Sequence, residues 1–230
     1  MSFKQKVKDL CKKNSWNFED LEKYFSLVTE TNKVLNLTGF EGDKLWEEGI
    51  YESLLFIDKI VTKTDSKTLL DIGAGAGFPS IPYAIVNKNL KITIYEPIKK
   101  RVDFLNTVVD TLSLEKNVQI FALRAEDVKD KNCFDLVTAR AVGDVSTMLM
   151  SSFHLISLNG YMALIKGKNY DSEIEHAQEI LKRIKTEITI EKLDTHNQKD
   201  NNIIWIKKLR SASSKFPYKW KDIISYKKKR

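Results

Sequence analysis

A glycine-rich segment contains residue types that can bind a nucleotide. Gly73, Gly75 and Gly77 occupy every second position, directly after the apolar run at 68–72. Glycines at this spacing let the backbone turn tightly and let a nucleotide approach the main chain, where a side chain would collide with it. Pro79 follows, a residue well suited to the first turn of a helix. The segment therefore predicts a strand, a nucleotide-binding loop and a helix.

Position 78 distinguishes between two cofactor classes. A dinucleotide fingerprint that starts at Gly73 requires a third small residue at position 78, where this chain has Phe78. The observed G-x-G-x-G spacing, with Asp71 two residues before Gly73, is closer to the loop of S-adenosylmethionine-dependent methyltransferases. An ordinary tight turn in an unrelated doubly wound sheet is the alternative interpretation.

Acidic residues follow the next two apolar runs. Glu96 closes the run at 91–96, where a carboxylate can accept hydrogen bonds from both ribose hydroxyls of a nucleotide. The third run is followed by Ala125 and Glu126, and an acid there with adjacent backbone amides could contact an adenine ring. Each acid alone could be a solvated residue at a strand end. Their joint placement after consecutive strands favours a cofactor site.

The residues after the fourth run restrict the chemistry of the methyl acceptor. The sequence there is Thr138-Ala139-Arg140-Ala141, without the Asp or Asn followed by Pro-Pro and an aromatic residue that methylation of an exocyclic base amine commonly uses. Methylation at carbon 5 of cytosine needs a cysteine nucleophile, and Cys133 precedes this run instead of ending it. Arg140 could bind the cofactor or a phosphate through paired hydrogen bonds, or be a surface arginine.

An acceptor that already presents a lone pair, such as ring nitrogen 7 of guanine, needs no general base. Transfer then depends mainly on holding donor and acceptor together, an effect that contributes roughly 7 to 11 kcal/mol. We therefore predict no catalytic acid or base in this chain.

The elements that must position these residues are seven strands and several helices. Short apolar runs separated by amphipathic stretches indicate a mostly parallel sheet, and the last two runs predict an antiparallel hairpin at its edge. The predicted strands are 68–72, 91–96, 118–123, 134–139, 160–166, 187–193 and 202–209, and the predicted helices between them are 79–87, 98–113, 144–156 and 171–184. Helical periodicity before them predicts an N-terminal helical cap over 1–64, with Asn17 capping its second helix. The methyltransferase domain is expected at 65–210 and a basic tail at 211–230.

Positive charge is concentrated at the end of the chain. From Lys207 onward there are ten basic residues and one acid, Asp222, so the preceding 206 residues hold 28 basic and 30 acidic residues. A basic segment of this kind is typical of a contact with nucleic acid or with an anionic surface. Phe216, Tyr218, Trp220 and Tyr226 could stack on unpaired bases there, or pack on the protein while the lysines are merely solvated.

Several other classes of site and location are not supported. Cys11 and Cys133 lie far apart, and no second cysteine pair exists, so we expect neither a disulfide nor a metal site. No apolar run approaches the roughly 20 residues that span a bilayer. The first residues, MSFKQKVKDLCKKN, lack the apolar segment of a secretory signal. We therefore expect a cytoplasmic protein without a membrane partner.

Several motifs together resemble one family of methyltransferases. They are NLTG (36–39), LLDIGAGAGFPSIP (69–82), KKRVDFL (99–105), RAED (124–127), TARAV (138–142) and ALIKG (163–167). The chain from about residue 20 to residue 210 resembles the RsmG (GidB) family. The resemblance implies a Rossmann-like methyltransferase that uses S-adenosylmethionine to modify ring nitrogen 7 of a guanosine in bacterial 16S ribosomal RNA. We expect no metal and no obligate protein partner, and we expect a monomer that acts on 16S rRNA or on the small ribosomal subunit.

The resemblance also implies site residues. The cofactor contacts of the family correspond to Gly73, Phe78, Ala125, Glu126 and Arg140, which join Gly75, Gly77 and Glu96 as the predicted cofactor residues. Basic positions suited to holding RNA or the charge of the transition state correspond to Lys100, Arg101, Arg124 and Lys166.

The chain departs from the family pattern at two places. Relatives usually have a basic residue and a histidine before an Asp-Ser-Leu, where this chain has Glu48 and Gly49, and position 78 is often Leu where this chain has Phe78. An NAD-dependent oxidoreductase and a non-catalytic RNA-binding protein with a degenerate methyltransferase fold are the alternative hypotheses.

Overall fold

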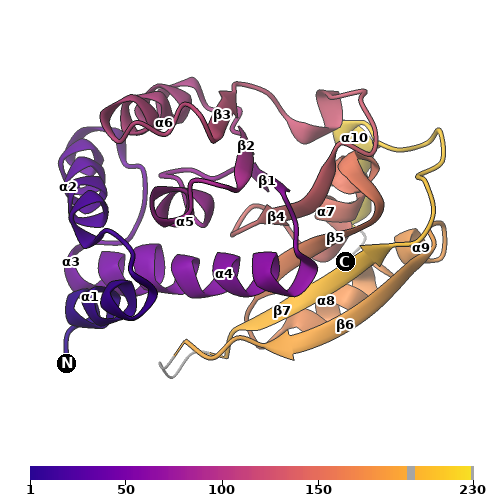
Figure 1. Cartoon of the computed structure of the whole chain (residues 1–230). Coiled ribbons are helices and arrows are strands. Elements are labelled where there is room, and N and C mark those ends of the chain that lie inside the picture. The colour runs from indigo at the N-terminus through magenta and orange to yellow at the C-terminus, as the bar shows by residue number, and fades with distance from the viewer. Residues whose placement is uncertain (196–199, 229–230) are drawn as a thin grey trace. The chain divides into compact units, whose positions relative to one another are not determined.

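Strands and helices alternate along most of the chain. The structure is a computed structural model that describes residues 1–195 and 200–228 (Figure 1). The chain divides into two units: unit 1 contains residues 1–67 and 73–122, and unit 2 contains residues 68–72 and 123–230. No helix among the described residues is long and apolar enough to cross a membrane.

Seven strands form the sheet. They are β1 (Thr68–Ile72), β2 (Lys91–Tyr95), β3 (Val118–Phe121), β4 (Phe134–Ala139), β5 (Ile156–Lys166), β6 (Thr186–Lys192) and β7 (Asn202–Lys208). Their order is β3-β2-β1-β4-β5-β7-β6, with β6 and β7 as an antiparallel hairpin at one edge. The predicted seven-stranded, mostly parallel sheet with an antiparallel edge hairpin is therefore confirmed.

Unit 1 contains the helices that precede the sheet and two that follow its strands (Figure 1). They are α1 (Phe3–Asn14), α2 (Phe18–Leu35), α3 (Gly42–Lys44), the π-helix η1 (Leu45–Tyr51), α4 (Glu52–Thr64), α5 (Ser80–Val86) and α6 (Lys99–Thr111). Asn17 caps α2 as predicted, because its side-chain oxygen accepts a hydrogen bond from the Glu19 amide at 2.9 Å. In α2 the residues Leu21, Tyr24 and Val28, spaced by three or four positions, form a fully buried stripe.

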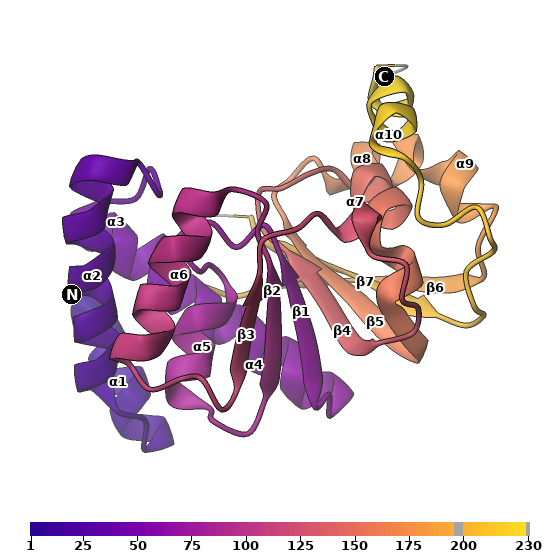
Figure 2. The ribbon, with the colours of Figure 1, turned by 90° about the horizontal axis from the view of Figure 1, so that it is seen from above.

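The strands of unit 1 form a short parallel pair, which Figure 2 shows from above. Ile92 of β2 is paired with Val118 of β3, and Ile94 is paired with Ile120. Both isoleucines of β2 are almost fully buried, as expected for a parallel strand covered on its faces.

Unit 2 contains the larger part of the sheet. Strand β4 pairs in parallel with β1 and β5, and β7 pairs antiparallel with β5 and β6. The beginnings of β1 and β4 are joined by side chains: the Thr68 amide donates to Asp135 Oδ2 at 3.0 Å, and the Asp135 amide donates to Thr68 Oγ1 at 2.9 Å. This reciprocal pair supports the register of the two strands.

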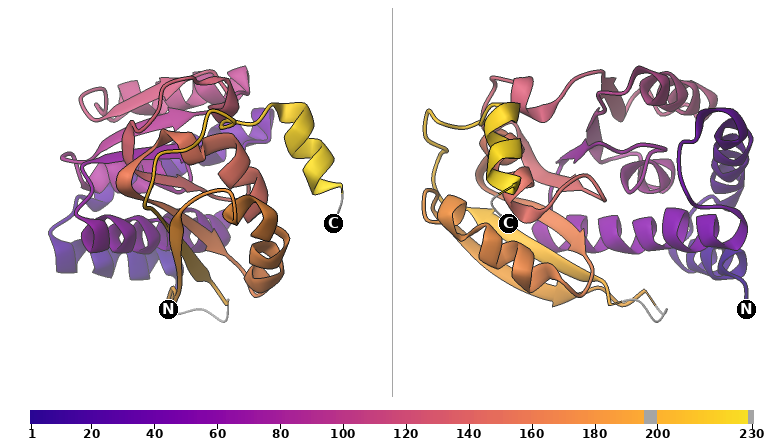
Figure 3. Two further views of the ribbon diagram at one scale, coloured as in Figure 1. Left: turned by 90° about the vertical axis from the view of Figure 1, so that its right-hand side faces the viewer. Right: turned by 180° about the vertical axis from the view of Figure 1, so that it is seen from behind.

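The helices of unit 2 are short. They are the 3-10 turns η2 (Ala125–Asp127) and η3 (Phe153–Leu155), and the α-helices α7 (Val145–Ser152), α8 (Tyr170–His176), α9 (Gln178–Leu181) and α10 (Trp220–Lys227). Helices α8 and α9 lie against one face of the β6–β7 hairpin (Figure 3). The single helix expected at 171–184 is divided at Ala177, whose ψ of −3° is far from the helical value.

The fifth strand begins earlier than the sequence indicates. It starts at Ile156 instead of 160, and the register to β4 shifts between Phe134 and Leu136. Asn159 has a positive φ of 64°, and Gly160 lies so close to the Asp135 carbonyl that a Cβ there would be 2.7 Å from it. This irregularity interrupts the alternation of apolar and polar residues that identifies a strand in a sequence. Residues 156–159 were therefore not predicted as part of the strand.

A buried lysine joins the end of β7 to η3. The Lys208 ammonium donates hydrogen bonds to Asn132 Oδ1 at 2.8 Å and to the carbonyls of Phe153, His154 and Ile156. Burial lowers the pKa of Lys208 to about 8. The fully buried ammonium of Lys208 is therefore stabilised by four hydrogen-bond acceptors in unit 2.

Candidate functional site

The glycine loop of unit 1 has a backbone conformation that requires glycine. The φ angles of Gly73, Gly75 and Gly77 are 68°, 61° and 107°, a region that side chains rarely adopt. The Gly73 amide donates to the Tyr95 carbonyl at 2.7 Å, and the Gly77 amide donates to the Ala74 carbonyl at 2.8 Å. The predicted loop is therefore a tight main-chain turn directly before α5.

Two glycines of this loop have different surroundings. A Cβ at Gly77 would lie 2.6 Å from Ile81 Cγ1 and 2.9 Å from the Tyr24 hydroxyl, so this glycine lets α5 and α2 approach the loop. A Cβ at Gly75 would meet only the Leu37 carbonyl, at 3.9 Å. A Cβ would therefore fit beside Gly75 with one ordinary contact, whereas the space beside Gly77 is filled by protein.

Tyr24 of α2 supports the glycine loop through a hydrogen bond, a role that the sequence pattern did not predict. Its hydroxyl is fully buried and donates a hydrogen bond to the Ala76 carbonyl at 2.7 Å. Tyr24 belongs to the buried stripe of α2, whose periodicity indicates burial without indicating a partner. The N-terminal helices therefore contribute directly to the geometry of the glycine loop.

Phe78 packs inward and connects the two departures from the family pattern. Its ring centroid lies 5.9 Å from that of Tyr24 and 6.1 Å from that of Phe40. A Cβ at Gly49 would lie 2.8 Å from Phe78 Cζ, so the ring occupies the space that a side chain at position 49 would need. Gly49 and Phe78 are thus complementary.

Glu96 lies beside the loop with its carboxylate almost completely buried. Oε2 accepts a hydrogen bond from the Gly75 amide at 3.0 Å, and Oε1 accepts one from the Ile98 amide at 3.0 Å. Each carboxylate oxygen can accept about two hydrogen bonds. Two acceptor positions beyond these amides are suited to the vicinal hydroxyls of a ribose, so the residues of this loop fit a nucleoside cofactor.

Arg101 lies next to Glu96. Its Nη1 is 3.9 Å from Glu96 Oε2, and its side chain is about one-third exposed. Lys100 is exposed in the same first turn of α6. Both were predicted as RNA contacts, and the structure brings Arg101 to the predicted ribose-binding acid.

The predicted adenine contacts lie in unit 2. Ala125 and Glu126 are buried in the turn η2. Glu126 Oε1 has no hydrogen-bond partner within the described part of the chain, although Arg124 Nη1 lies 3.8 Å away. A buried carboxylate oxygen favours a donor. An amino group such as that of adenine would supply one.

Arg140 and Lys166 lie at the ends of β4 and β5. Arg140 is partly exposed and is followed by Ala141, which has a positive φ of 57°. Lys166 Nζ forms an ion pair with Glu173 at 2.9 Å and a hydrogen bond with the Gly143 carbonyl. Lys166, predicted as an RNA contact, therefore holds the loop after β4 in this structure.

The eight predicted cofactor residues are distributed over both units. Unit 1 contains Gly73, Gly75, Gly77, Phe78 and Glu96, and brings Gly75 and Glu96 into direct contact. Unit 2 contains Ala125, Glu126 and Arg140. Their assignment to one cofactor stays a prediction.

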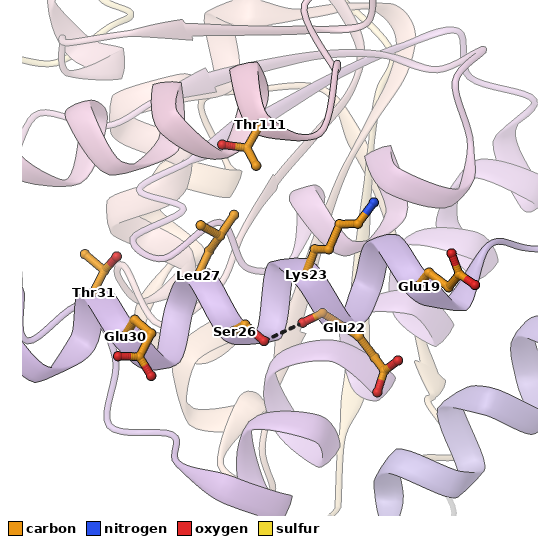
Figure 4. A pocket seen from close by; sticks show the side chains of 8 residues that line it. All are labelled: Glu19, Glu22, Lys23, Ser26, Leu27, Glu30, Thr31 and Thr111. Carbon is orange, nitrogen blue, oxygen red and sulfur yellow. Dashed lines mark hydrogen bonds between the residues drawn. The ribbon is translucent and has the colours of Figure 1, made fainter.

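A groove on unit 1 contains none of these residues. It has a volume of about 680 Å³ and runs along α2 opposite the end of α6 (Figure 4). Its lining contains three glutamates and one lysine: Glu19, Glu22, Glu30 and Lys23. This excess of negative charge disfavours phosphate, so the groove is a poor candidate for RNA.

The described residues contain neither a cluster of metal-ligating side chains nor a disulfide. No group of three or more His, Cys, Asp or Glu side chains there could hold a metal ion. Cys11 is buried and Cys133 is exposed, and both thiols are free.

Sequence comparison connects the chain with one family. The model of the family described as "rRNA small subunit methyltransferase G" (GidB) matches residues 17–204. The ribosomal RNA small subunit methyltransferase G of Mycoplasmopsis pulmonis is 40% identical over 209 residues, which cover 89% of this chain and 90% of that protein.

Structure comparison gives methyltransferases of the same fold. A putative caffeoyl-CoA O-methyltransferase from Staphylococcus aureus has a TM-score of 0.55 at 16% identity, covering 89% of this chain and 98% of that chain. The O-methyltransferase from Bacillus cereus, solved in complex with SAH, has a TM-score of 0.52 at 14% identity, covering 85% of this chain and 99% of that chain. At these identities the similarity concerns the fold alone.

Proposed function

Because the chain belongs to the rRNA small subunit methyltransferase G family, we propose that it transfers the methyl group of S-adenosylmethionine to ring nitrogen 7 of a guanosine in 16S ribosomal RNA. The cofactor supplies an electrophilic methyl group on a positively charged sulfur. The family supports the reaction class and the RNA substrate. The guanosine nitrogen follows from the resemblance of the sequence motifs.

The observation that carries this proposal is the contact between Gly75 and Glu96. The Gly75 amide donates to a buried carboxylate that has further acceptor capacity, and the space beside Gly75 is open. A ribose can therefore place its hydroxyls on Glu96 while its nucleoside passes close to the loop. Phe78 packs toward Tyr24 and Phe40, so the small third residue of a dinucleotide fingerprint is absent. This arrangement favours S-adenosylmethionine over NAD.

The remaining cofactor contacts are proposed residue by residue. Gly73, Gly77 and Phe78 shape the loop of unit 1, and Ala125, Glu126 and Arg140 are the contacts proposed from unit 2. Glu126 Oε1, which lacks a hydrogen-bond partner among the described residues, is suited to the exocyclic amine of adenine.

In the proposed reaction these residues bind the cofactor and orient it toward the guanosine. Nitrogen 7 of guanine uses its lone pair to form the new carbon–nitrogen bond, the carbon–sulfur bond breaks, and the positive charge moves from sulfur to the base. No proton leaves the acceptor, so no general base is required. Positioning of the kind that these residues provide contributes roughly 7 to 11 kcal/mol in favourable cases.

The proposed setting follows from the substrate. The protein would act as a monomer in the cytoplasm on 16S rRNA, either free or in the small ribosomal subunit. Lys100, Arg101 and Arg124 are the proposed basic contacts for its phosphates, whereas Lys166 is engaged with Glu173.

A methyl-transfer assay tests the proposal. The full chain is incubated with labelled S-adenosylmethionine and small-subunit RNA, and the nucleosides are analysed by mass spectrometry. We expect 7-methylguanosine with the wild type and its loss with Glu96→Ala. Glu115→Ala, at an exposed acid of unit 1 that precedes β3, serves as the control. Isothermal titration that detects NAD but not S-adenosylmethionine would overturn the cofactor assignment, and transfer to another atom would overturn the acceptor.

A further inference from the structure

The C-terminal segment, residues 211–228, separates its aromatic side chains into two groups. Phe216 is 2% exposed and its ring lies 5.8 Å from that of Phe153, while Tyr218 is 6% exposed and accepts a hydrogen bond from Arg183 Nη1 at 3.1 Å. The Tyr226 hydroxyl donates to the His176 carbonyl at 2.7 Å. These three rings contact unit 2 and anchor the segment to it.

Trp220 differs from them. It opens α10 and is 44% exposed. The guanidinium of Arg124 lies 4.8 Å from the centroid of its ring, and the Arg124 side chain is itself 47% exposed. Two flat side chains that both stack well on nucleic-acid bases therefore lie together at the surface of unit 2.

The helix that carries Trp220 is attached to unit 2 through one buried residue. Ile223 is 1% exposed, and α10 packs against α7. The other side chains of α10 are partly or fully exposed. Trp220 therefore lies at the start of a helix that contacts the fold, with its ring open to solvent.

The charge around Trp220 selects the class of ligand. Lys219, Lys221, Lys227 and Lys228 are exposed on and beside α10, against the single acid Asp222. Lys229 and Arg230 lie outside the described residues. Cations beside an exposed aromatic ring are the combination that binds single-stranded nucleic acid, because every base has a flat face and every nucleotide carries a phosphate.

The pair also adjoins the proposed adenine contacts. Arg124 directly precedes Ala125 and Glu126, and its Nη1 is 3.8 Å from Glu126 Oε1. An RNA held at Arg124 would thus be next to a loop of the proposed cofactor site within the same unit.

We propose that Trp220 and Arg124 form a stacking platform for an unpaired base of the RNA substrate, with Lys219 and Lys221 contacting the neighbouring phosphates. The proposal rests on the proposed function, because it takes ribosomal RNA as the substrate. It assigns direct RNA contact to Trp220 and an anchoring role to Phe216, Tyr218 and Tyr226.

The first test compares Trp220→Ala with Trp220→Phe in the full chain. Affinity is measured for a single-stranded fragment of small-subunit RNA, and affinity for S-adenosylmethionine is measured by isothermal titration. Removal of a stacked ring weakens nucleic-acid binding by roughly 5- to 150-fold. We expect a decrease in this range for Trp220→Ala, recovery of most of the affinity for Trp220→Phe, and unchanged cofactor affinity for both. Leu158→Ala, at an exposed apolar residue of β5, is the matched control.

The second test separates stacking from charge. Each phosphate of a single strand that a protein neutralises adds about 0.7 to the salt slope of log affinity. Lys219→Gln combined with Lys221→Gln should therefore reduce the slope by about 1.4. Trp220→Ala should weaken binding without changing the slope.

Several results would overturn the platform. The first is an RNA affinity of Trp220→Ala equal to that of the wild type. The second is a Trp220→Ala chain that loses cofactor affinity but keeps RNA affinity, which would make Trp220 a positioning residue for the cofactor. The third is a Trp220→Ala chain that loses a concentration-dependent dimer but keeps RNA affinity, which would place Trp220 in an interface between copies of the chain. A wild-type chain that does not bind the RNA would instead overturn the proposed function, so the two failures are distinguishable.

Discussion

The glycine loop of unit 1 depends mainly on main-chain geometry, with hydrogen bonds to the side chains of Tyr24 and Glu96 as supports, whereas the C-terminal segment of unit 2 is held mainly by packed side chains. In the loop, positive φ angles and amide-to-carbonyl hydrogen bonds set the conformation. In the C-terminal segment, Phe216, Tyr218 and Ile223 are buried while the lysines are exposed. An added Cβ should therefore damage the glycine loop, and a removed ring should damage the C-terminal segment. Substitutions can test this distinction.

The largest expected effect is on the anchoring of the C-terminal segment. Replacing a buried phenylalanine by alanine typically destabilises a protein by about 3 to 5 kcal/mol. We expect Phe216→Ala to lower the free energy of unfolding of the protein by this amount, measured by urea denaturation. Trp220→Ala, at an exposed ring of the same segment, should change it by less than about 1 kcal/mol. Equal effects of the two substitutions would contradict the division of the aromatics.

A pH titration should also separate the two regions. His154, beside the anchoring site of Phe216, has its pKa lowered to about 4, first by burial, although a hydrogen bond to the Val128 carbonyl acts in the opposite direction. Its folded pKa is below the unfolded value, so the unfolded state binds the proton more readily. Stability is therefore complete above pH 6.5 and decreases by up to roughly 3 kcal/mol as the pH falls toward 4.

Peptide-level hydrogen exchange, corrected for the intrinsic rate at each pH, measures where this decrease occurs. Unit 1 contains no histidine in its sequence. We expect peptides around η3 and the C-terminal segment to lose protection at pH 4.5 before those of the glycine loop. His154→Gln should reduce the difference. Uniform loss of protection in both units would indicate that other groups dominate.

Two neighbouring glycines provide a finer comparison within the loop. Gly77→Ala introduces both a positive-φ strain and a collision with Ile81, and such changes destabilise by roughly 2 to 5 kcal/mol together. Gly75→Ala introduces the strain alone, about 1 to 2 kcal/mol, but fills the space proposed for the cofactor. Thermal unfolding should therefore respond more to Gly77→Ala, and titration with S-adenosylmethionine more to Gly75→Ala. The reverse order of effects would contradict the proposal that the cofactor binds beside Gly75.

The smallest effect concerns the support of the loop by α2. Tyr24→Phe removes the hydrogen bond to the Ala76 carbonyl and leaves the ring packing in place. The net contribution of one hydrogen bond is about 1 kcal/mol, more if the carbonyl stays buried without a donor. We expect a decrease in stability of this size, measured by denaturation, with cofactor affinity reduced less than in Gly75→Ala. No change in either quantity would show that the hydroxyl does not support the loop.

Much of the fold could be predicted from the sequence, because it depends on the local pattern of apolar and polar residues. Strands β1 and β4 begin and end at the predicted residues, since each is a short apolar run between polar residues. The division of 171–184 at Ala177 was not predictable, because alanine is a strong helix former and the break depends on tertiary packing.

The candidate site was predictable where the backbone demands a residue type. Gly73, Gly75 and Gly77 are such positions, and Glu96 follows from its place after a strand. Arg101 beside Glu96 and Trp220 beneath Arg124 were not predictable as contacts, because each pair joins residues from different elements. Charge and aromatic content predicted an RNA contact in the tail but could not say which rings are buried.

Phe78 and Gly49 share one space, so substitutions at the two positions are coupled. A Cβ at Gly49 would lie 2.8 Å from Phe78 Cζ and 2.8 Å from Leu45 Cδ1. A side chain introduced at 49 alone would therefore force the Phe78 ring or Leu45 to shift, whereas a smaller residue at 78 would free part of that space. The two positions should be exchanged as a pair when this loop is redesigned.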